Sequence, residues 1–204
     1  MNQFVKLNLK YVYPKSNIDR TVVVPNDWTL AFLHEVVQEC FGWLDYHLHE
    51  FVDGKEVHYV TQEDPDRASM ARQVGHKYIE KLDRDVRISA VLKKKGDMLD
   101  YIYDFGDDNR VKIKCLGIVA DFDEEQFESC GPDLIEDSMG FMGTPGIVKI
   151  LSGDKKSAQY KECVRWLDEA FHKSPSAVLV EPSVGEIFAR VEHMVRLVCT
   201  ASVG

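Results

Sequence analysis

Two histidines and a group of aspartates are the residues whose types and spacing could do chemistry. His47 and His49 stand two residues apart in a segment expected to be a strand, so both imidazoles would project from one face. Asp104, Asp107 and Asp108 fall in a turn between two further β-like segments. Because imidazole and carboxylate groups bind divalent metals, these five residues are the candidate ligands of one ion. No other cofactor is expected.

A structural role competes with metal binding for the same residues, and it is the interpretation we favour. Half-buried strand histidines near Glu50 need no metal. Aspartate also suits a tight turn, because its side chain accepts hydrogen bonds from nearby backbone amides. Paired carboxylates could alternatively divide acid and base roles, where their environments differ. The chain lacks a Gly-x-Ser-x-Gly motif and a phosphate-binding Gly-Lys-Ser/Thr loop, so no catalytic residue is assigned.

Negative charge is concentrated in one stretch of the chain. The 204 residues carry 25 Lys and Arg against 34 Asp and Glu, a net charge of −9. Residues 119–140 contain eight acids and no base, so this stretch alone contributes −8. An EF-hand is excluded, since Gln126 and Pro132 stand where that loop needs Gly and Glu. A solvated loop, a weaker cation site and an imitation of nucleic-acid phosphate remain as alternatives.

The function we expect is a non-catalytic interaction module whose acidic loop, residues 121–137, docks on a protein partner by charge complementarity. The docking residues would be Asp121, Asp123, Glu124, Glu125 and Glu128. The first alternative is a metal-dependent, hydrolase-like enzyme that uses the His and Asp residues above. The second is a protein that associates with nucleic acid or mimics it.

Nucleic acid is not an expected partner, because an acidic chain opposes phosphate binding. Lys77, Lys81 and Arg84, with Lys93–Lys95, could form a basic patch, but interleaved acids favour a mixed solvated face. Oligomeric state has no signature in the sequence.

The composition predicts a folded protein of the cytoplasm. Apolar residues make up 45% and charged residues 29%, values typical of globular domains. Five widely spaced cysteines, an odd number without a Cys-x-x-Cys pair, argue against disulfides and a zinc knuckle. The uncharged stretch Ser138–Val148 is too short to span a bilayer, so no membrane partner is expected.

Hydrophobic periodicity predicts the elements that must position these residues. Alternating segments predict strands at 4–13, 20–24, 47–52, 56–61, 99–103 and 111–115, with a two-residue Asp53-Gly54 turn closing the second pair. Helical spacing predicts helices after Thr29, within 62–85 (Met70, Val74, Tyr78, Leu82), at 157–171 and around 187–198.

These elements predict an α+β fold with a β-β-α-β start. Hairpins form an antiparallel or mixed sheet, and the helices pack on one face. We expect one α+β domain over residues 1–172 and a C-terminal helical extension, 173–204, packed on the same domain.

Three sequence blocks carry a family resemblance. They are Phe41-Gly42-Trp43, His47-Leu48-His49-Glu50-Phe51 and Tyr101-x-Tyr103-Asp104-Phe105-Gly106-Asp107-Asp108. Their order and separation, over about residues 4–118, resemble the plasmid pRiA4b ORF-3-like family, whose members are often labelled plasmid or insertion-element passenger proteins. The resemblance implies a compact α+β fold and an accessory gene of mobile elements, but no established reaction.

Two positions depart from that family's pattern. Asn109 stands where relatives usually have Trp, and Ser129–Asp133 only loosely echoes their Cys-Pro-Pro-Glu-Asp block. If that block builds a site in relatives, the site in this chain is altered or absent.

Overall fold

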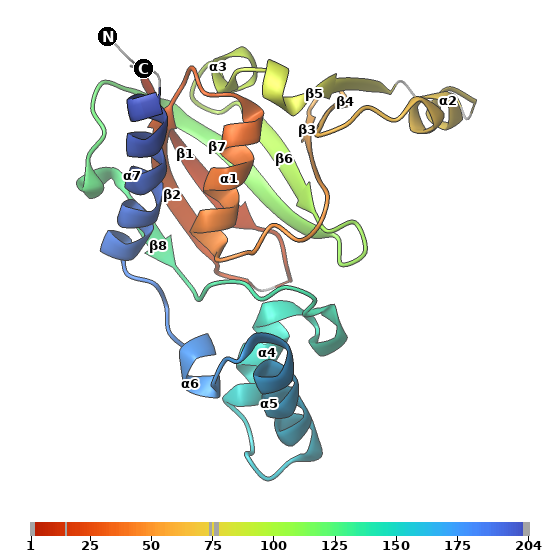
Figure 1. Cartoon of the computed structure of the whole chain (residues 1–204), viewed down its shortest axis with the longest axis vertical. Helices are drawn as coiled ribbons and strands as arrows, with labels where there is room; N and C mark the ends of the chain where they lie inside the picture. Colours follow the sequence, from red (N-terminus) through yellow and green to blue (C-terminus); the bar gives the residue numbers. More distant parts are fainter. Residues whose placement is uncertain (1–2, 15, 74, 76–77, 202–204) are drawn as a thin grey trace.

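A single eight-stranded sheet forms the frame of the protein (Figure 1). The computed structural model describes residues 3–14, 16–73, 75 and 78–201. The strands are β1 (Phe4–Tyr11), β2 (Asp19–Pro25), β3 (His49–Asp53), β4 (Val57–Val60), β5 (Ile79–Leu82), β6 (Met98–Tyr103), β7 (Asn109–Val119) and β8 (Glu128–Cys130). Their order is β5-β4-β3-β6-β7-β1-β2-β8, antiparallel except for the parallel pair β4–β5.

The helices are α1 (Leu30–Phe41), α2 (Pro65–Gln73), α3 (Ile88–Val91), α4 (Gly143–Leu151), α5 (Ala158–Phe171), α6 (Pro175–Val178) and α7 (Val184–Ala201). Short 3-10 turns occupy Asp83–Asp85, Glu124–Gln126 and Met139–Phe141. Within the described part of the chain, no helix is both long enough and apolar enough to cross a membrane.

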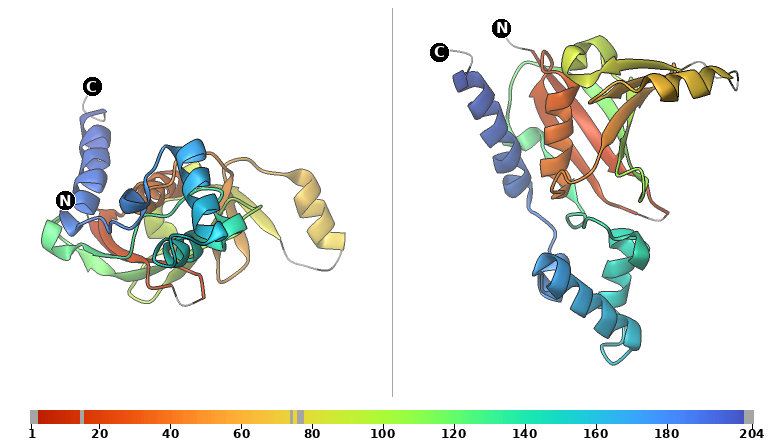
Figure 2. Two further views of the ribbon diagram at one scale, coloured as in Figure 1. Left: turned by 90° about the horizontal axis from the view of Figure 1, so that it is seen from below. Right: turned by 45° about the vertical axis from the view of Figure 1, so that its right-hand side comes forward.

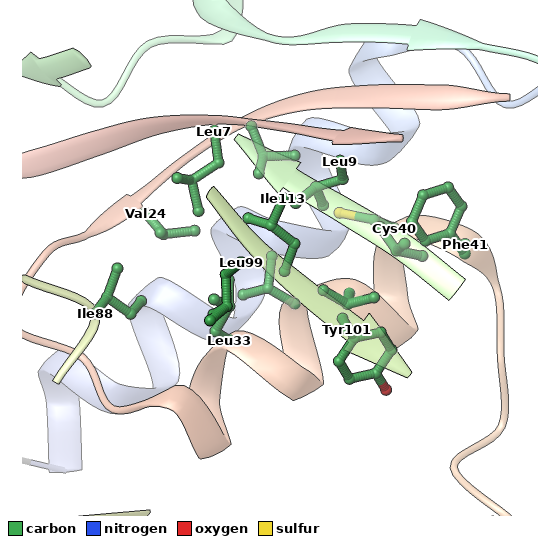
Figure 3. Packing of buried hydrophobic residues seen from close by; sticks show 14 of the residues in the cluster. Leu7, Leu9, Val24, Leu33, Cys40, Phe41, Ile88, Leu99, Tyr101 and Ile113 are labelled. Atoms are coloured by element: carbon green, nitrogen blue, oxygen red, sulfur yellow. The ribbon is translucent and has the colours of Figure 1, made fainter. Parts of the chain in front are cut away.

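Helices α1 and α7 lie side by side on one face of the sheet (Figures 1 and 2). Period-two alternation buries Val5, Leu7 and Leu9 of β1 on that face. Leu33 of α1 and Ile88 point into the same core, as Figure 3 shows. The α+β prediction, with helices on one face and a β-β-α-β start, is confirmed.

Helix α1 begins and ends where its sequence predicts. The Thr29 hydroxyl accepts a hydrogen bond from the Phe32 amide, which caps the first turn. Gly42 adopts φ 70°, and a Cβ there would come within 2.8 Å of the Asp133 side chain. Glycine is therefore required at this position both by the backbone and by the segment packed against it.

A second, smaller core lies beyond one end of the sheet (Figure 2). Helices α4, α5 and α6 supply it, with Ile147, Cys163, Leu167 and Val178 buried. Ile135 joins this core from the connecting segment, and its backbone amide donates to the Thr144 hydroxyl. The sequence predicted α5 but neither α4 nor the short edge strand β8.

Two local predictions were wrong. The helix expected within 62–85 ends at Gln73, and Ile79–Leu82 forms strand β5; Val74, one of its expected positions, lies outside the described residues. Edge pairing with β4 overrides the four-residue apolar spacing there. The loop between β3 and β4 holds three residues, with Glu56 at φ 60°, because Asp53 accepts hydrogen bonds from the Lys55 and Val57 amides.

Buried Arg20 joins three parts of the fold. Its guanidinium is 0% exposed and donates to five backbone carbonyls, those of Asp19, Cys40, Cys130, Gly131 and Pro132. It also lies 3.7 Å from Asp133, which Arg190 of α7 holds at 2.9 Å. Arg20 therefore fastens β2, the end of α1 and the 130–133 segment together.

Replacing Arg20 with methionine should lower the free energy of unfolding by at least about 3 kcal/mol, because several buried carbonyls lose their donors. Urea denaturation monitored by circular dichroism measures the change. Arg165→Met, at an exposed position of α5, is the matched control and should stay within about 0.5 kcal/mol. Equal stabilities for the two variants would refute the role assigned to Arg20.

Candidate functional site

His47 faces three carboxylates at the end of the sheet. Its Nε2 lies 3.8 Å from Asp104 Oδ2, 3.7 Å from Glu136 Oε2 and 3.4 Å from Asp137 Oδ1. The His47 side chain is 28% exposed, yet its Nε2 atom is buried and has no hydrogen-bond partner among the described residues. We call these four residues the His47 cluster.

The turn after β6 positions Asp104. Its backbone adopts φ 57°, in the left-handed region that aspartate tolerates better than most residues. One carboxylate oxygen, Oδ1, accepts hydrogen bonds from the Gly106 and Asp107 amides, as turn chemistry requires. The other oxygen, Oδ2, is the one that faces His47. Asp104 is thus a turn former and a cluster member at once.

The two carboxylate oxygens of Glu136 also have different roles. The residue is 2% exposed, and Oε1 accepts hydrogen bonds from the Leu44 amide at 2.7 Å and the Tyr103 hydroxyl at 2.9 Å. Burial and this bond raise the pKa of Tyr103, so its hydroxyl stays a donor. Glu136 Oε2 is buried without a hydrogen-bond partner among the described residues and lies towards His47.

Asp137 completes the cluster from the solvent side. It follows Glu136 directly, is exposed, and has φ 50°. Its Oδ1 and the facing atoms of His47 and Asp104 all lie within 4.8 Å of one another, a spacing that one metal ion could bridge.

The separations in the cluster match a coordination shell better than a hydrogen-bond network. Ligand atoms at about 2.0–2.2 Å from one tetrahedral ion are about 3.3–3.6 Å apart, which follows from the bond lengths of zinc sites. The distance from His47 Nε2 to Asp137 Oδ1, 3.4 Å, falls in this range, and that to Asp104 Oδ2, 3.8 Å, lies just outside it; both exceed the usual length of an N–H···O bond.

The structure separates the five sequence-predicted ligands. His47 and Asp104 come together. Asp107 lies next to them, its Oδ2 accepting the Met139 amide at 3.2 Å; partial burial and the neighbouring carboxylates raise its pKa. Asp108 instead forms an exposed ion pair with Arg110.

His49 belongs to a different cluster. Strand β3 begins at His49, so His47 precedes the strand and the inference that both rings share one face was wrong. The His49 ring stacks on His34 with centroids 3.6 Å apart, and its Nε2 lies 2.9 Å from Asp83. His34 pairs in turn with Tyr101 and Asp45, which satisfies both its ring nitrogens. His49 therefore has a packing role, as expected for a buried strand histidine.

Sequence reasoning missed Glu136 and Asp137 as partners of His47. The available signal was the run of eight acids in residues 119–140, but nothing local separates its members. Asp133 forms ion pairs with Arg20 and Arg190. Glu136 accepts a hydrogen bond from the Tyr103 hydroxyl. The five residues expected to dock a partner, by contrast, are all exposed: Asp121, Asp123, Glu124, Glu125 and Glu128.

The stacked rings of His34 and His49 predict that the free energy of unfolding depends on pH. Burial, with the neighbouring His49, lowers the pKa of His34 from 6.5 to about 4. Between these values the unfolded chain binds a proton that the folded chain does not, so stability falls as the pH drops from 6.5 towards 4. The slope is up to about 1.4 kcal/mol per pH unit.

Urea denaturation across this pH range should show that slope reduced in His34→Gln. His172→Asn, an exposed position after α5, serves as the control and should keep the wild-type slope. An unchanged pH dependence in His34→Gln would contradict the assignment.

Comparisons with known proteins agree with this architecture. The chain is 28% identical over 181 residues to the uncharacterised protein y4hQ of Sinorhizobium fredii, covering 85% of this chain and 84% of the relative. The crystal structure of MM3350, a protein of unknown function from Methanosarcina mazei Go1, superimposes with a TM-score of 0.64 at 25% identity, covering 84% of this chain and 93% of that one. The model of the family described as plasmid pRiA4b ORF-3-like protein matches residues 3–177. The chain therefore belongs to the plasmid pRiA4b ORF-3-like family.

Proposed function

We propose that the His47 cluster binds one divalent metal ion and uses it for hydrolysis. The observation that carries the proposal is a pair of buried polar atoms, His47 Nε2 and Glu136 Oε2, which lie 3.7 Å apart and have no hydrogen-bond partner in the described part of the chain. Leaving such groups unpaired costs about 1–3 kcal/mol each. A bound cation with its water would satisfy both.

The donor set indicates the kind of metal. One imidazole nitrogen with the carboxylates of Asp104 and Asp137 suits zinc or manganese, whereas magnesium and calcium prefer oxygen ligands alone. Three protein ligands leave a coordination position for water, as in catalytic zinc sites. Asp137 is exposed, so solvent could reach an ion held at this cluster.

Glu136 would act as the general base. Its Oε1 is held by Leu44 and Tyr103, so Oε2 has a fixed direction towards His47. A bound divalent ion would supply the positive charge that lowers the pKa of a water, and Glu136 Oε2 would accept the proton of that attacking water and later return it to the leaving group. The left-handed backbone at Asp104 and Asp137 fits a site whose geometry is imposed by its surroundings.

A groove of about 600 Å³ is lined by chain neighbours of the cluster residues, although none of the four cluster residues lines it. Leu48 and Phe105, the residues that follow His47 and Asp104, form part of its wall. Arg67 contributes a cation next to the Phe105 ring. Glu63 and Asp64 also line the groove, and Arg67 pairs with Glu50 at 3.3 Å, so the groove combines apolar contact with charges of both signs.

Isothermal titration with ZnCl₂ and with MnCl₂ tests the metal site. His47→Asn and Asp137→Asn should each weaken binding at least tenfold, because each removes a ligand. The matched control is Asp108→Asn. Asp108 lies in the turn that also carries Asp104 but pairs with Arg110, so this variant should bind the metal as the wild type does. Wild-type protein that takes up neither metal would refute the site.

Glu136→Gln separates binding from hydrolysis in the same experiment. It should keep metal affinity within a few fold, yet lower the hydrolysis rate of bis-p-nitrophenyl phosphate or p-nitrophenyl acetate by about 10²–10⁴. Metal uptake by wild-type protein without turnover of either probe would reduce the proposal to a binding site.

The acidic segment supports a second candidate function, docking of a basic protein partner. Asp121, Asp123, Glu124, Glu125 and Glu128 are exposed and make no ion pair with any described residue. Their charge is therefore available to a partner.

Changing Asp123, Glu124, Glu125 and Glu128 together to Asn or Gln should reduce the affinity for a fluorescent deca-lysine peptide at least tenfold. The control changes four exposed acids elsewhere, Asp154, Glu162, Asp168 and Glu169. Equal losses in both variants would show net charge at work and count against a docking segment.

A further inference from the structure

Lysines gather on the sheet face opposite α1 and α7. Strand β7 exposes Arg110, Lys112 and Lys114, while the residues between them, such as Val111 and Ile113, are fully buried in the core. Because side chains alternate along a strand, the three cations share the open face. Lys6 and Lys10 alternate with buried residues of neighbouring β1 in the same way.

The strand register places like charges opposite each other. Lys10 of β1 is the direct partner of Lys112 of β7, an arrangement that destabilises a sheet. Lys6, Lys10, Lys112 and Lys114 make no ion pair with any described residue. Within the described part of the sheet, these four cations therefore form no ion pair with a neighbouring side chain.

Two aspartates stand near these lysines without pairing with them. Asp19 is the register partner of Lys10, and Asp100 is that of Lys112. Neither forms an ion pair within the described part of the chain. Arg110, in contrast, is neutralised by Asp108.

The turn before β6 carries further exposed lysines, which stand apart from this row. Cys115 exchanges backbone hydrogen bonds with the turn, accepting from the Gly96 amide and donating to the Asp97 carbonyl. These bonds place Gly96 and Asp97 beside Cys115, whereas Lys93 and Lys94 line a hollow with Ala90 and Val91 of α3. We call Lys6, Lys10, Lys112 and Lys114 the basic sheet face.

Net charge does not oppose an anionic partner here. Residues 119–140 account for −8 of the −9, so the rest of the chain is close to neutral. In physiological salt, charges are screened beyond about 8 Å, and the local arrangement decides what a surface contacts.

We propose that the basic sheet face binds the phosphate backbone of single-stranded nucleic acid. Lysines two residues apart on one strand are about 6.6–6.8 Å apart, which forms a regular row of cations for a repeating anion. Met98 of β6 is the register partner of Lys114, and Val12 directly follows β1; they are 50% and 43% exposed and offer apolar contact to unstacked bases. Contacts of this kind depend on backbone charge and not on base sequence.

Fluorescence anisotropy with a labelled dT20 oligonucleotide, in 25–200 mM NaCl, tests the proposal on the full chain. Binding should weaken with salt, with a logarithmic slope of about −0.7 per phosphate contact. Lys112→Gln with Lys114→Gln should lower the affinity at least tenfold and reduce the slope by about 1.4. The matched control, Lys155→Gln with Lys156→Gln, changes two exposed lysines between α4 and α5 and should leave both values unchanged.

Three results would overturn the proposal. The first is no anisotropy change at 25 mM NaCl. The second is an equal loss in the control pair. The third is displacement of dT20 by poly-glutamate at equal charge concentration, which would show that an acidic protein segment is the occupant. His47→Asn should bind dT20 as the wild type does, so failure here and failure of the metal site are distinguishable.

Discussion

The buried guanidinium of Arg20 is the constraint on which the rest of the structure depends. A fully desolvated cation is costly unless its donors are satisfied. The donors of Arg20 are satisfied by five backbone carbonyls, and the Asp133 carboxylate lies 3.7 Å away. Three of these carbonyls belong to the 130–132 segment, which has little regular structure of its own. The segment is thereby held against β2 and the end of α1, and the residues that follow it lie at the end of the sheet.

The candidate site results from this placement of the residues that follow the 130–132 segment. The Leu134 amide donates to the Phe41 carbonyl, and Glu136 then meets Leu44 and Tyr103, so the chain continues over the loop that carries His47. Asp104 arrives from the opposite direction, on the turn between β6 and β7. In Asp104 and Glu136 alike, one oxygen is held by protein donors while the other remains for the cluster. Structural and chemical roles are thus combined in one carboxylate.

Periodicity predicted the parts of the fold in which local and tertiary preferences agree. The alternation of β1, β6 and β7 and the capped helix α1 are examples, because each carries one apolar face or stripe and a clear boundary residue. The prediction was wrong over residues 62–85, where edge pairing with β4 decides the conformation of Ile79–Leu82. It was also wrong for His47. Strand β3 begins at His49, two residues later than predicted, so the His47 ring does not take part in the alternation of that strand.

The sequence by itself determined the fold class, the hairpins and the apolar faces, since these follow from spacing within about a dozen residues, and it singled out His47 and Asp104 as candidate ligands. Only the tertiary structure decided that Glu136 and Asp137 join them, that His49 stacks on His34, and that the lysines of β1 and β7 share one open face. Each of these depends on residues far apart in the chain, and their approach is set by burial, strand register and the pairing of Arg20. No local pattern encodes such contacts, because their energies exist only once the sheet and its connecting segment are assembled.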